Sequence, residues 1–286
     1  MRSRHILVAS MVLGSSLIAF AQTAPKAVLL RLEPTQTIVA GVLEGKTWTD
    51  PDKLGATSQA FIKAGLNTVL LGTNGALGKA TSSGFEAQDA PCDWVRNTTI
   101  STALKVPKFP AYAISAKWNP VPRAIQNILP ENAAYQKIMA AELKARKINA
   151  PVAMSQILKT DLDGDKIDEV ILVAQRPKVR FDAQRRLEPK YEQAVGDYSL
   201  VLVRKVMAGG VKTFVLGERK VTKLFNGTGE GLPTVLTQYV TAIADIDGDG
   251  RMEVFVDDYV HEGEGMSIFG WNGKGFKTML EWGCGV

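Results

Sequence analysis

Histidine and cysteine are scarce in this chain, with two of each among 286 residues. His5 lies in the N-terminal segment, so His261 is the only histidine in the remainder of the chain. A zinc site with two or more histidine ligands is thereby excluded, and a serine or cysteine hydrolase would have to use His261 as its base. His261 stands in the acidic stretch Asp257–Glu264, which is more typical of a surface loop than of a catalytic centre.

A strong excess of charge of either sign is also missing. The chain has 34 basic and 29 acidic residues, and loss of Arg2 and Arg4 with an N-terminal segment would leave 32 against 29, a net charge of +3. Binding to a phosphate backbone depends on concentrated positive charge. Basic residues become denser between Arg176 and Lys223, but without interleaved aromatic residues, which favours a solvated face. We therefore expect no nucleic-acid partner.

A long apolar run occurs only at the N-terminus. Arg2 and Arg4 precede the apolar stretch Ile6–Phe20, and Ala21 completes a small-x-small pattern. The run is shorter than the ~20 residues that a membrane-spanning helix needs. This pattern predicts a signal peptide at residues 1–21. The mature protein is then expected to be secreted or periplasmic, without a membrane span.

The two cysteines, Cys92 and Cys284, are far apart in the sequence. Export would place them in an oxidising compartment, where a disulfide is permitted. In the chain-entropy model, closing so long a loop stabilises the fold by up to ~5 kcal/mol. The alternative is a pair of buried thiols, and the sequence leaves both open. A bridge would tie the C-terminus to the N-terminal half of the chain.

The chain divides into an N-terminal region, residues 22–150, and a repetitive region, residues 151–286. Residues 26–125 combine β-branched segments with glycine turns and a proline-rich stretch, which predicts irregular strands. Ala60–Leu71 fits a short helix or a strand. Glu131–Ile148 lacks glycine and proline and has apolar residues at helical spacing, which predicts a helix. The expected fold is mainly β with one long helix.

The repetitive region contains two copies of one strand pattern. Each copy is predicted to be a four-stranded antiparallel meander with an acidic loop between its first and second strands. The expected strands are Val152–Lys159, Val170–Ala174, Tyr198–Val206 and Val211–Leu216 in the first copy, and Val235–Ala244, Val254–Val256, Met266–Trp271 and Phe276–Trp282 in the second.

The two acidic loops, loop 1 (Asp161–Glu169) and loop 2 (Asp245–Glu253), have acids at positions 1, 3, 5 and 9. Two carboxylates ~5 Å apart repel by about 3 kcal/mol at an effective dielectric constant of 20. Ca²⁺ takes 6–8 oxygen ligands in flexible geometry and would relieve this repulsion. The alternative is a pair of aspartate-rich turns without metal. The expected ligands, with position 7 supplying a backbone carbonyl, are Asp161, Asp163, Asp165, Ile167 and Glu169, and Asp245, Asp247, Asp249, Arg251 and Glu253.

Neither loop fits an EF-hand, which needs glutamate at position 12 and a following helix. Residues 160–173 and 244–256 instead resemble the calcium loops of the FG-GAP or VCBS repeat family, found in integrin-type β-propellers. The resemblance covers roughly residues 150–286 and implies calcium binding and blade-like sheets. Loop 1 departs from the family at Lys166, where glycine is usual, which would weaken that site.

The resemblance leaves the architecture open, because a propeller needs at least four blades and only two copies are visible. Residues 26–125 could supply further, degenerate blades. The alternative is a smaller β-sheet assembly with the predicted helix packed against it.

For function, the sequence favours a non-enzymatic, calcium-stabilised exported protein that binds a protein partner or a cell-wall polymer. The family's use in adhesion supports this by analogy alone. The alternative is an extracellular polysaccharide hydrolase with paired carboxylates, which needs no histidine. Asp93, Asp257 and Asp258 are the candidate carboxylates for that chemistry.

Overall fold

The computed structural model describes residues 25–33, 36–63, 65–87, 92, 95–104, 111–176, 194–223, 237–260 and 263–285. The described chain is mainly β, and its strand pairs are antiparallel, which confirms the predicted class. The predicted signal peptide, Asp93 and His261 lie outside the described residues. Within the described part of the chain, no helix is long and apolar enough to cross a membrane.

The N-terminal strands close into a six-stranded barrel in the order β1-β7-β4-β5-β6-β2, because β1 also pairs with β2. A short strand, β3 (Thr47–Thr49), extends β2 as a hairpin. This closed barrel replaces the irregular strands that the sequence predicts for residues 26–125, and it supplies no further blades. The barrel strands are β1 (Ala27–Leu32), β2 (Thr37–Glu44), β4 (Leu66–Gly72), β5 (Gly75–Ala87), β6 (Arg96–Ser101) and β7 (Ala111–Ile114).

Strand β1 shows how the barrel is filled and covered. Successive side chains of a strand point to opposite faces, so Val28 and Leu30 lie in the barrel interior, whereas Leu29 and Arg31 point outward. Both faces are buried, and the apolar pattern therefore lacks the alternation of a half-exposed strand. Helix α1 (Ala56–Lys63) adds Ile62 to the interior cluster, after the single 3₁₀ turn η1 (Pro51–Lys53).

The chain after the barrel forms two antiparallel sheets, the β8–β12 sheet and the β13–β16 sheet. The strands expected for the second copy make a four-stranded sheet, whereas those expected for the first copy are joined by a fifth strand, β8, which precedes residue 151 and pairs with β9. The strands are β8 (Gln126–Ile128), β9 (Met154–Thr160), β10 (Glu169–Arg176), β11 (Tyr198–Met207), β12 (Gly210–Lys220), β13 (Thr237–Ala244), β14 (Glu253–Val260), β15 (Gly263–Trp271) and β16 (Phe276–Gly285).

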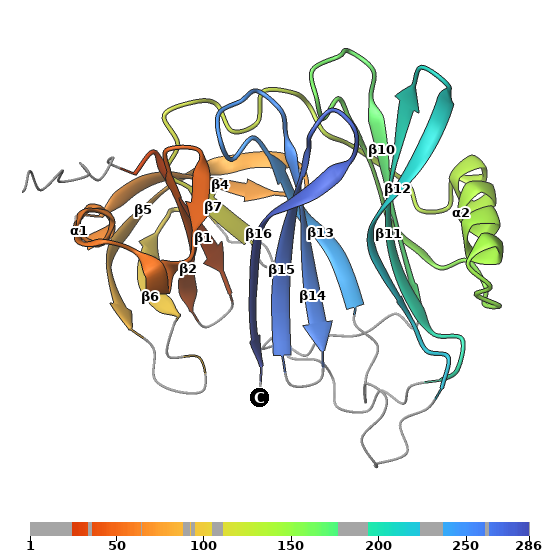
Figure 1. The fold of residues 1–286 in the computed structure, drawn as a ribbon, viewed down its shortest axis with the longest axis horizontal. Helices are drawn as coiled ribbons and strands as arrows, with labels where there is room; N and C mark the ends of the chain where they lie inside the picture. The colour runs from red at the N-terminus through yellow and green to blue at the C-terminus, as the bar shows by residue number, and fades with distance from the viewer. Residues whose placement is uncertain are drawn as a thin grey trace, which may run out of the picture.

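The barrel, the two sheets and helix α2 stack in layers across the molecule (Figure 1). Leu29 and Tyr112 of the barrel pack with Phe255 of the β13–β16 sheet. The other face of that sheet meets the β8–β12 sheet, where Val173 and Val254 share a core cluster. The described sheets form an open stack, so the closed-propeller alternative is wrong for this part of the chain.

Helix α2 (Ala133–Ala145) covers the outer face of the β8–β12 sheet, with Met139 and Leu143 in the shared core. It is shorter than the predicted 131–148. Asn132 caps its start by accepting hydrogen bonds from two backbone N–H groups. It ends early because Lys147 adopts a positive φ of 57°. The described chain therefore has two α-helices, α1 and α2, in place of one long helix.

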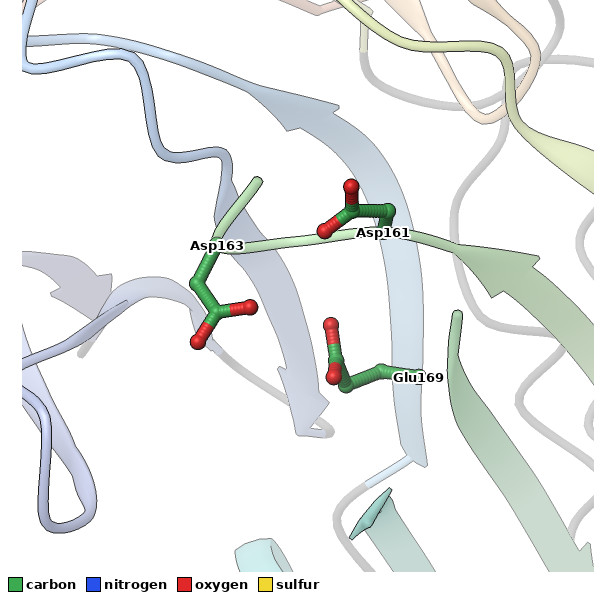
Figure 2. Close-up of side chains that lie close together, drawn as sticks. All are labelled: Asp161, Asp163 and Glu169. Atoms are coloured by element: carbon green, nitrogen blue, oxygen red, sulfur yellow. The ribbon is translucent and has the colours of Figure 1, made fainter. Parts of the chain in front are cut away.

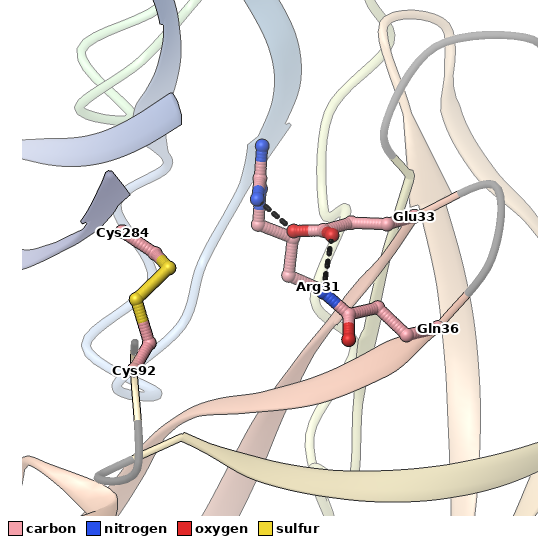
Figure 3. Close-up of a disulfide and its surroundings, with 5 residues drawn as sticks. All are labelled: Arg31, Glu33, Gln36, Cys92 and Cys284. Atoms are coloured by element: carbon pink, nitrogen blue, oxygen red, sulfur yellow. Dashed lines mark hydrogen bonds and ion pairs between the residues drawn. A yellow bond between two sulfur atoms is a disulfide. The ribbon is translucent and has the colours of Figure 1, made fainter. Parts of the chain in front are cut away.

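A disulfide joins Cys92 to Cys284, with their Cα atoms 6.1 Å apart. Cys92 precedes barrel strand β6, and Cys284 lies on β16, so the bridge fastens the last strand of the chain to the barrel (Figure 3). This settles the question that the sequence leaves open, in favour of the bridge.

A buried charge cluster lies in the same barrel–sheet interface. The Arg31 guanidinium is fully buried and pairs with Asp257 at 2.9 Å and Glu264 at 3.0 Å. It also pairs with Glu33, which accepts a hydrogen bond from Gln36 (Figure 3). Burial raises the pKa of Glu33 to about 7, against the opposing effect of Arg31.

Candidate metal centre

Loop 1 joins β9 to β10 and loop 2 joins β13 to β14, and the two loops contact each other. The Met252 N–H donates to the Leu162 carbonyl at 2.8 Å. The Arg123 guanidinium donates to the carbonyls of Leu162 at 3.0 Å and Gly250 at 2.8 Å. The Trp118 indole N–H donates to the Asp245 carbonyl at 2.9 Å. The segment between the barrel and β8 therefore holds both loops in place.

Each loop gathers three carboxylates from positions 1, 3 and 9. In loop 1 these are Asp161, Asp163 and Glu169, whose carboxylates point toward one another (Figure 2). One oxygen from each lies within 4.8 Å of the others, and the same holds for Asp245, Asp247 and Glu253 in loop 2. The structure thus brings together six of the ten predicted ligands.

Backbone N–H groups fix these carboxylates identically in both loops. Asp161 accepts from the N–H groups at positions 4 and 6 at 2.7 and 3.0 Å, and Asp245 does the same at 2.7 and 3.0 Å. Glu169 accepts from the Leu162 N–H at 2.7 Å, and Glu253 accepts from the Ile246 N–H at 2.9 Å. Hydrogen bonds from neutral donors orient the carboxylates but leave their negative charge in place.

The predicted ligands at positions 5 and 7 lie outside these three-carboxylate clusters. Asp165 accepts from the Ile167 N–H at 2.8 Å, and Asp249 accepts from the Arg251 N–H at 2.8 Å. The Ile167 side chain is exposed and carries no ligand atom, so this residue has only its backbone carbonyl to offer. Asp249 also pairs with the Arg251 guanidinium at 3.5 Å on the exposed side of loop 2.

Loop 2 concentrates negative charge at its centre. In the described part of the chain, no lysine or arginine forms an ion pair with Asp245, Asp247 or Glu253. Burial raises the pKa of all three groups, most strongly that of Glu253, and repulsion among the loop acids adds to the effect, against the lowering effect of backbone hydrogen bonds and, at Asp247, of Arg251. Such a site stabilises a bound cation because the carboxylates repel one another without it.

Loop 1 has a side chain at its centre that the sequence analysis missed. The Lys205 ammonium, 4% exposed, lies 2.9 Å from Asp163, 3.1 Å from Asp165 and 2.7 Å from Glu169. Burial opposes its charge, but the hydrogen bonds that the ammonium donates to these carboxylates outweigh that effect and raise the pKa of Lys205.

Lys205 therefore departs from the solvated face predicted for the basic residues between 176 and 223. The sequence signal is its position in a mainly apolar strand, where alternation places Lys205 on the same face as Val201 and Val203. Which loop Lys205 contacts depends on the register between β10 and β11, and the sequence does not show this long-range pairing.

The donor set fits a hard cation in both loops. Carboxylate and carbonyl oxygens are the ligands that Ca²⁺ and Mg²⁺ take in proteins. The Lys205 ammonium in loop 1 shows where a positive charge sits among these carboxylates. Loop 2 presents the same carboxylate arrangement, without the lysine. Two carboxylate clusters capable of binding a metal ion are therefore present.

Lys166 adopts a left-handed backbone conformation with φ of 70°, where loop 2 has Gly250 with φ of 85°. A side chain in this region costs about 1–2 kcal/mol. Lys166→Gly should raise the free energy of unfolding by about 0.5–1 kcal/mol, since added freedom of the unfolded chain offsets part of the gain. Urea denaturation in EDTA measures this.

The matched control is Gly250→Ala, because a Cβ at Gly250 meets nothing within 4 Å and its cost is purely conformational. That variant should lose a similar amount of stability. A neutral or destabilising effect of Lys166→Gly would show that the strain is compensated by contacts of the lysine.

Of the carboxylates considered for a hydrolase, the two that the structure describes, Asp257 and Asp258, do not form a pair. Asp257 is fully buried and accepts hydrogen bonds from Arg31 at 2.9 Å and from the Tyr112 hydroxyl at 2.7 Å. Asp258 follows it in strand β14 and points to the opposite face, where it accepts from Gln238 at 2.8 Å. The strand thus separates the two groups.

Comparison of the chain with protein-family models, with curated proteins and with solved structures finds no significant match.

Proposed function

We propose that this protein is an exported, non-enzymatic calcium-binding protein, in which bound calcium stabilises a β-repeat module that displays a surface to a protein partner or cell-wall polymer. The observation that carries the proposal is the cluster of Asp245, Asp247 and Glu253 in loop 2, with Asp245 and Glu253 buried, with which no lysine or arginine of the described residues forms an ion pair. Three carboxylates held together by the backbone are unfavourable unless a cation neutralises them.

Calcium is favoured over magnesium by the character of loop 2. Mg²⁺ demands near-ideal octahedral geometry and usually keeps several waters, whereas Ca²⁺ accepts 6–8 oxygens in flexible geometry. Loop 2 offers carboxylates at positions 1, 3 and 9, a further carboxylate at position 5, and a carbonyl at position 7. Asp245 and Glu253 are buried to 3% and 2% exposure, which leaves little room for a hydration shell.

The resemblance to FG-GAP or VCBS repeats supports the same proposal. Each acidic loop joins the first two strands of an antiparallel meander, and the two meanders pack face to face. In this interpretation the β13–β16 sheet is one blade. The β8–β12 sheet is a second blade carrying an additional edge strand. Export fits weak calcium sites of roughly 10⁻⁴–10⁻³ M, which suffice outside the cytosol.

The hydrolase alternative finds less support. Paired catalytic carboxylates have to face a common cleft about 5–10 Å apart. Asp257 is committed to Arg31, and Asp258 lies on the other face of the sheet. No observation on the described residues favours this second function.

Calcium should raise the melting temperature of residues 22–286. Free calcium at 100 times its dissociation constant stabilises the folded state by about 2.7 kcal/mol, or roughly 5–10 °C for a chain of this size. Differential scanning calorimetry in millimolar calcium and in excess EDTA measures this shift.

The informative variant is Glu253→Gln, which keeps the hydrogen bond from Ile246 and removes the charge. It should abolish the calcium shift and melt no lower than wild type in EDTA, because repulsion within loop 2 is relieved. Glu281→Gln, on an exposed part of β16, serves as the control and should retain the full shift. An unchanged melting temperature of the wild type in calcium, or an equal shift in Glu253→Gln, would contradict the proposal.

A further inference from the structure

Lys205 and Gly270 occupy equivalent positions in the two sheets. Val170 pairs with Arg204 across β10 and β11, and Val254 pairs with Phe269 across β14 and β15. Continuing each register by one residue places Lys205 opposite Glu169, the last acid of loop 1. It likewise places Gly270 opposite Glu253, the last acid of loop 2.

The direction of each side chain confirms this equivalence. Lys205 reaches Glu169 at 2.7 Å. A Cβ built on Gly270 would lie 3.4 Å from the Glu253 side chain and 2.2 Å from the Met279 sulfur. A side chain at position 270 would therefore point toward loop 2, but Met279 takes the space in which it would begin. Loop 2 consequently cannot receive a cation from its own sheet in the way that loop 1 does.

We propose that the two loops differ in kind: loop 1 is held by the Lys205 ammonium as a built-in cation and takes no calcium, whereas loop 2 binds the single calcium ion. This inference rests on the proposed function, because it assigns the calcium of that function to one loop. The Lys205 ammonium hydrogen-bonds to Asp163, Asp165 and Glu169, three of the acids expected to bind calcium.

The setting of Lys205 makes its displacement by calcium unfavourable. The side chain is 4% exposed, and its ammonium also lies 5.6 Å from the centre of the Trp271 ring in the facing sheet. An entering calcium ion would have to break three charge-assisted hydrogen bonds, which are stronger than neutral ones. The calcium ion would also place two positive charges close to the Lys205 ammonium, which side-chain packing keeps near loop 1.

The asymmetry has a consequence for the molecule. The β8–β12 sheet has a cation, the Lys205 ammonium, in its loop at any calcium concentration. The β13–β16 sheet, which contacts the barrel through Phe255 and the disulfide, depends on calcium to neutralise loop 2. Changes in calcium concentration should therefore act on the layer that lies between the barrel and the β8–β12 sheet.

Isothermal titration calorimetry with CaCl₂ tests the assignment. The wild type should bind one calcium ion, Glu169→Gln should still bind one, and Glu253→Gln should bind none. These isosteric changes keep the backbone hydrogen bonds of both loops. Two ions in the wild type, or loss of the single ion in Glu169→Gln with retention in Glu253→Gln, would overturn the inference and leave calcium binding itself intact. No binding to the wild type would overturn the proposed function as well.

The variant Lys205→Met provides a second test of the assignment. Removing the ammonium should open loop 1, so that the variant binds two calcium ions, melts well below wild type in EDTA and recovers most of the difference in calcium. Lys212→Met, at an exposed position on β12, is the control and should behave as the wild type. One ion bound by a folded Lys205→Met would contradict the role of Lys205. The Glu169→Gln and Glu253→Gln titrations decide the assignment if this variant does not fold.

Discussion

Arg31→Met should lower the free energy of unfolding by about 3–5 kcal/mol, the usual cost of removing one partner from a buried ion pair. The guanidinium is fully buried between the barrel and the β13–β16 sheet. It donates to Asp257 and Glu264 and lies 4.9 Å from the centre of the Trp282 ring. Without it, Asp257 would keep a buried negative charge with only hydroxyl donors from Tyr112 and Thr241. Urea denaturation at neutral pH measures the loss.

The double variant Arg31→Met/Asp257→Asn separates lost charge pairing from lost packing. Replacing both partners removes the uncompensated charge, so the double variant should be more stable than Arg31→Met alone, with a coupling energy of about 1–3 kcal/mol. A loss below 1 kcal/mol for Arg31→Met, or strict additivity of the two changes, would show that the charge cluster does not hold the barrel to the sheet.

Replacing both cysteines with serine should lower the free energy of unfolding by about 2–5 kcal/mol. The bridge spans 192 residues of sequence and restricts the unfolded chain more than a short loop would. In the folded state it also fastens β16, the edge strand of the β13–β16 sheet, to the barrel. Urea denaturation without reductant gives this difference.

Reduction of the wild type supplies the matched control for the disulfide. Wild type in excess reductant should unfold at the same urea concentration as the Cys92→Ser/Cys284→Ser variant. Equal stability of the oxidised wild type and the double variant would contradict a stabilising role for the bridge.

The acidic loops could be predicted because the residues that identify them lie close together in the sequence. The spacing of acids at positions 1, 3, 5 and 9, repeated twice before β-branched strands, is enough to place both clusters. The glycine expected at position 6 was also informative, because Lys166 adopts the strained conformation that this position imposes. The helix at 133–145 follows from its apolar spacing, and its last turn is lost where Lys147 turns left-handed.

The barrel and the lysine of loop 1 depend on contacts between distant parts of the sequence. The barrel is completed by pairing of β7 with β1 and of β6 with β2, and neither contact leaves a local pattern. β1 is buried on both faces, so it lacks the alternation that marks a strand exposed on one side. Lys205 reaches its acids only because β11 pairs with β10 in one particular register, and one residue of slip would turn it away.

The most direct test of the calcium assignment is a crystal structure of residues 22–286 grown in millimolar CaCl₂, with an anomalous difference map recorded at long wavelength. We expect one calcium peak among Asp245, Asp247 and Glu253, and no peak in loop 1, where the Lys205 ammonium should lie among Asp163, Asp165 and Glu169. A calcium peak in loop 1 with Lys205 displaced, or an ordered loop 2 without any peak, would contradict the account.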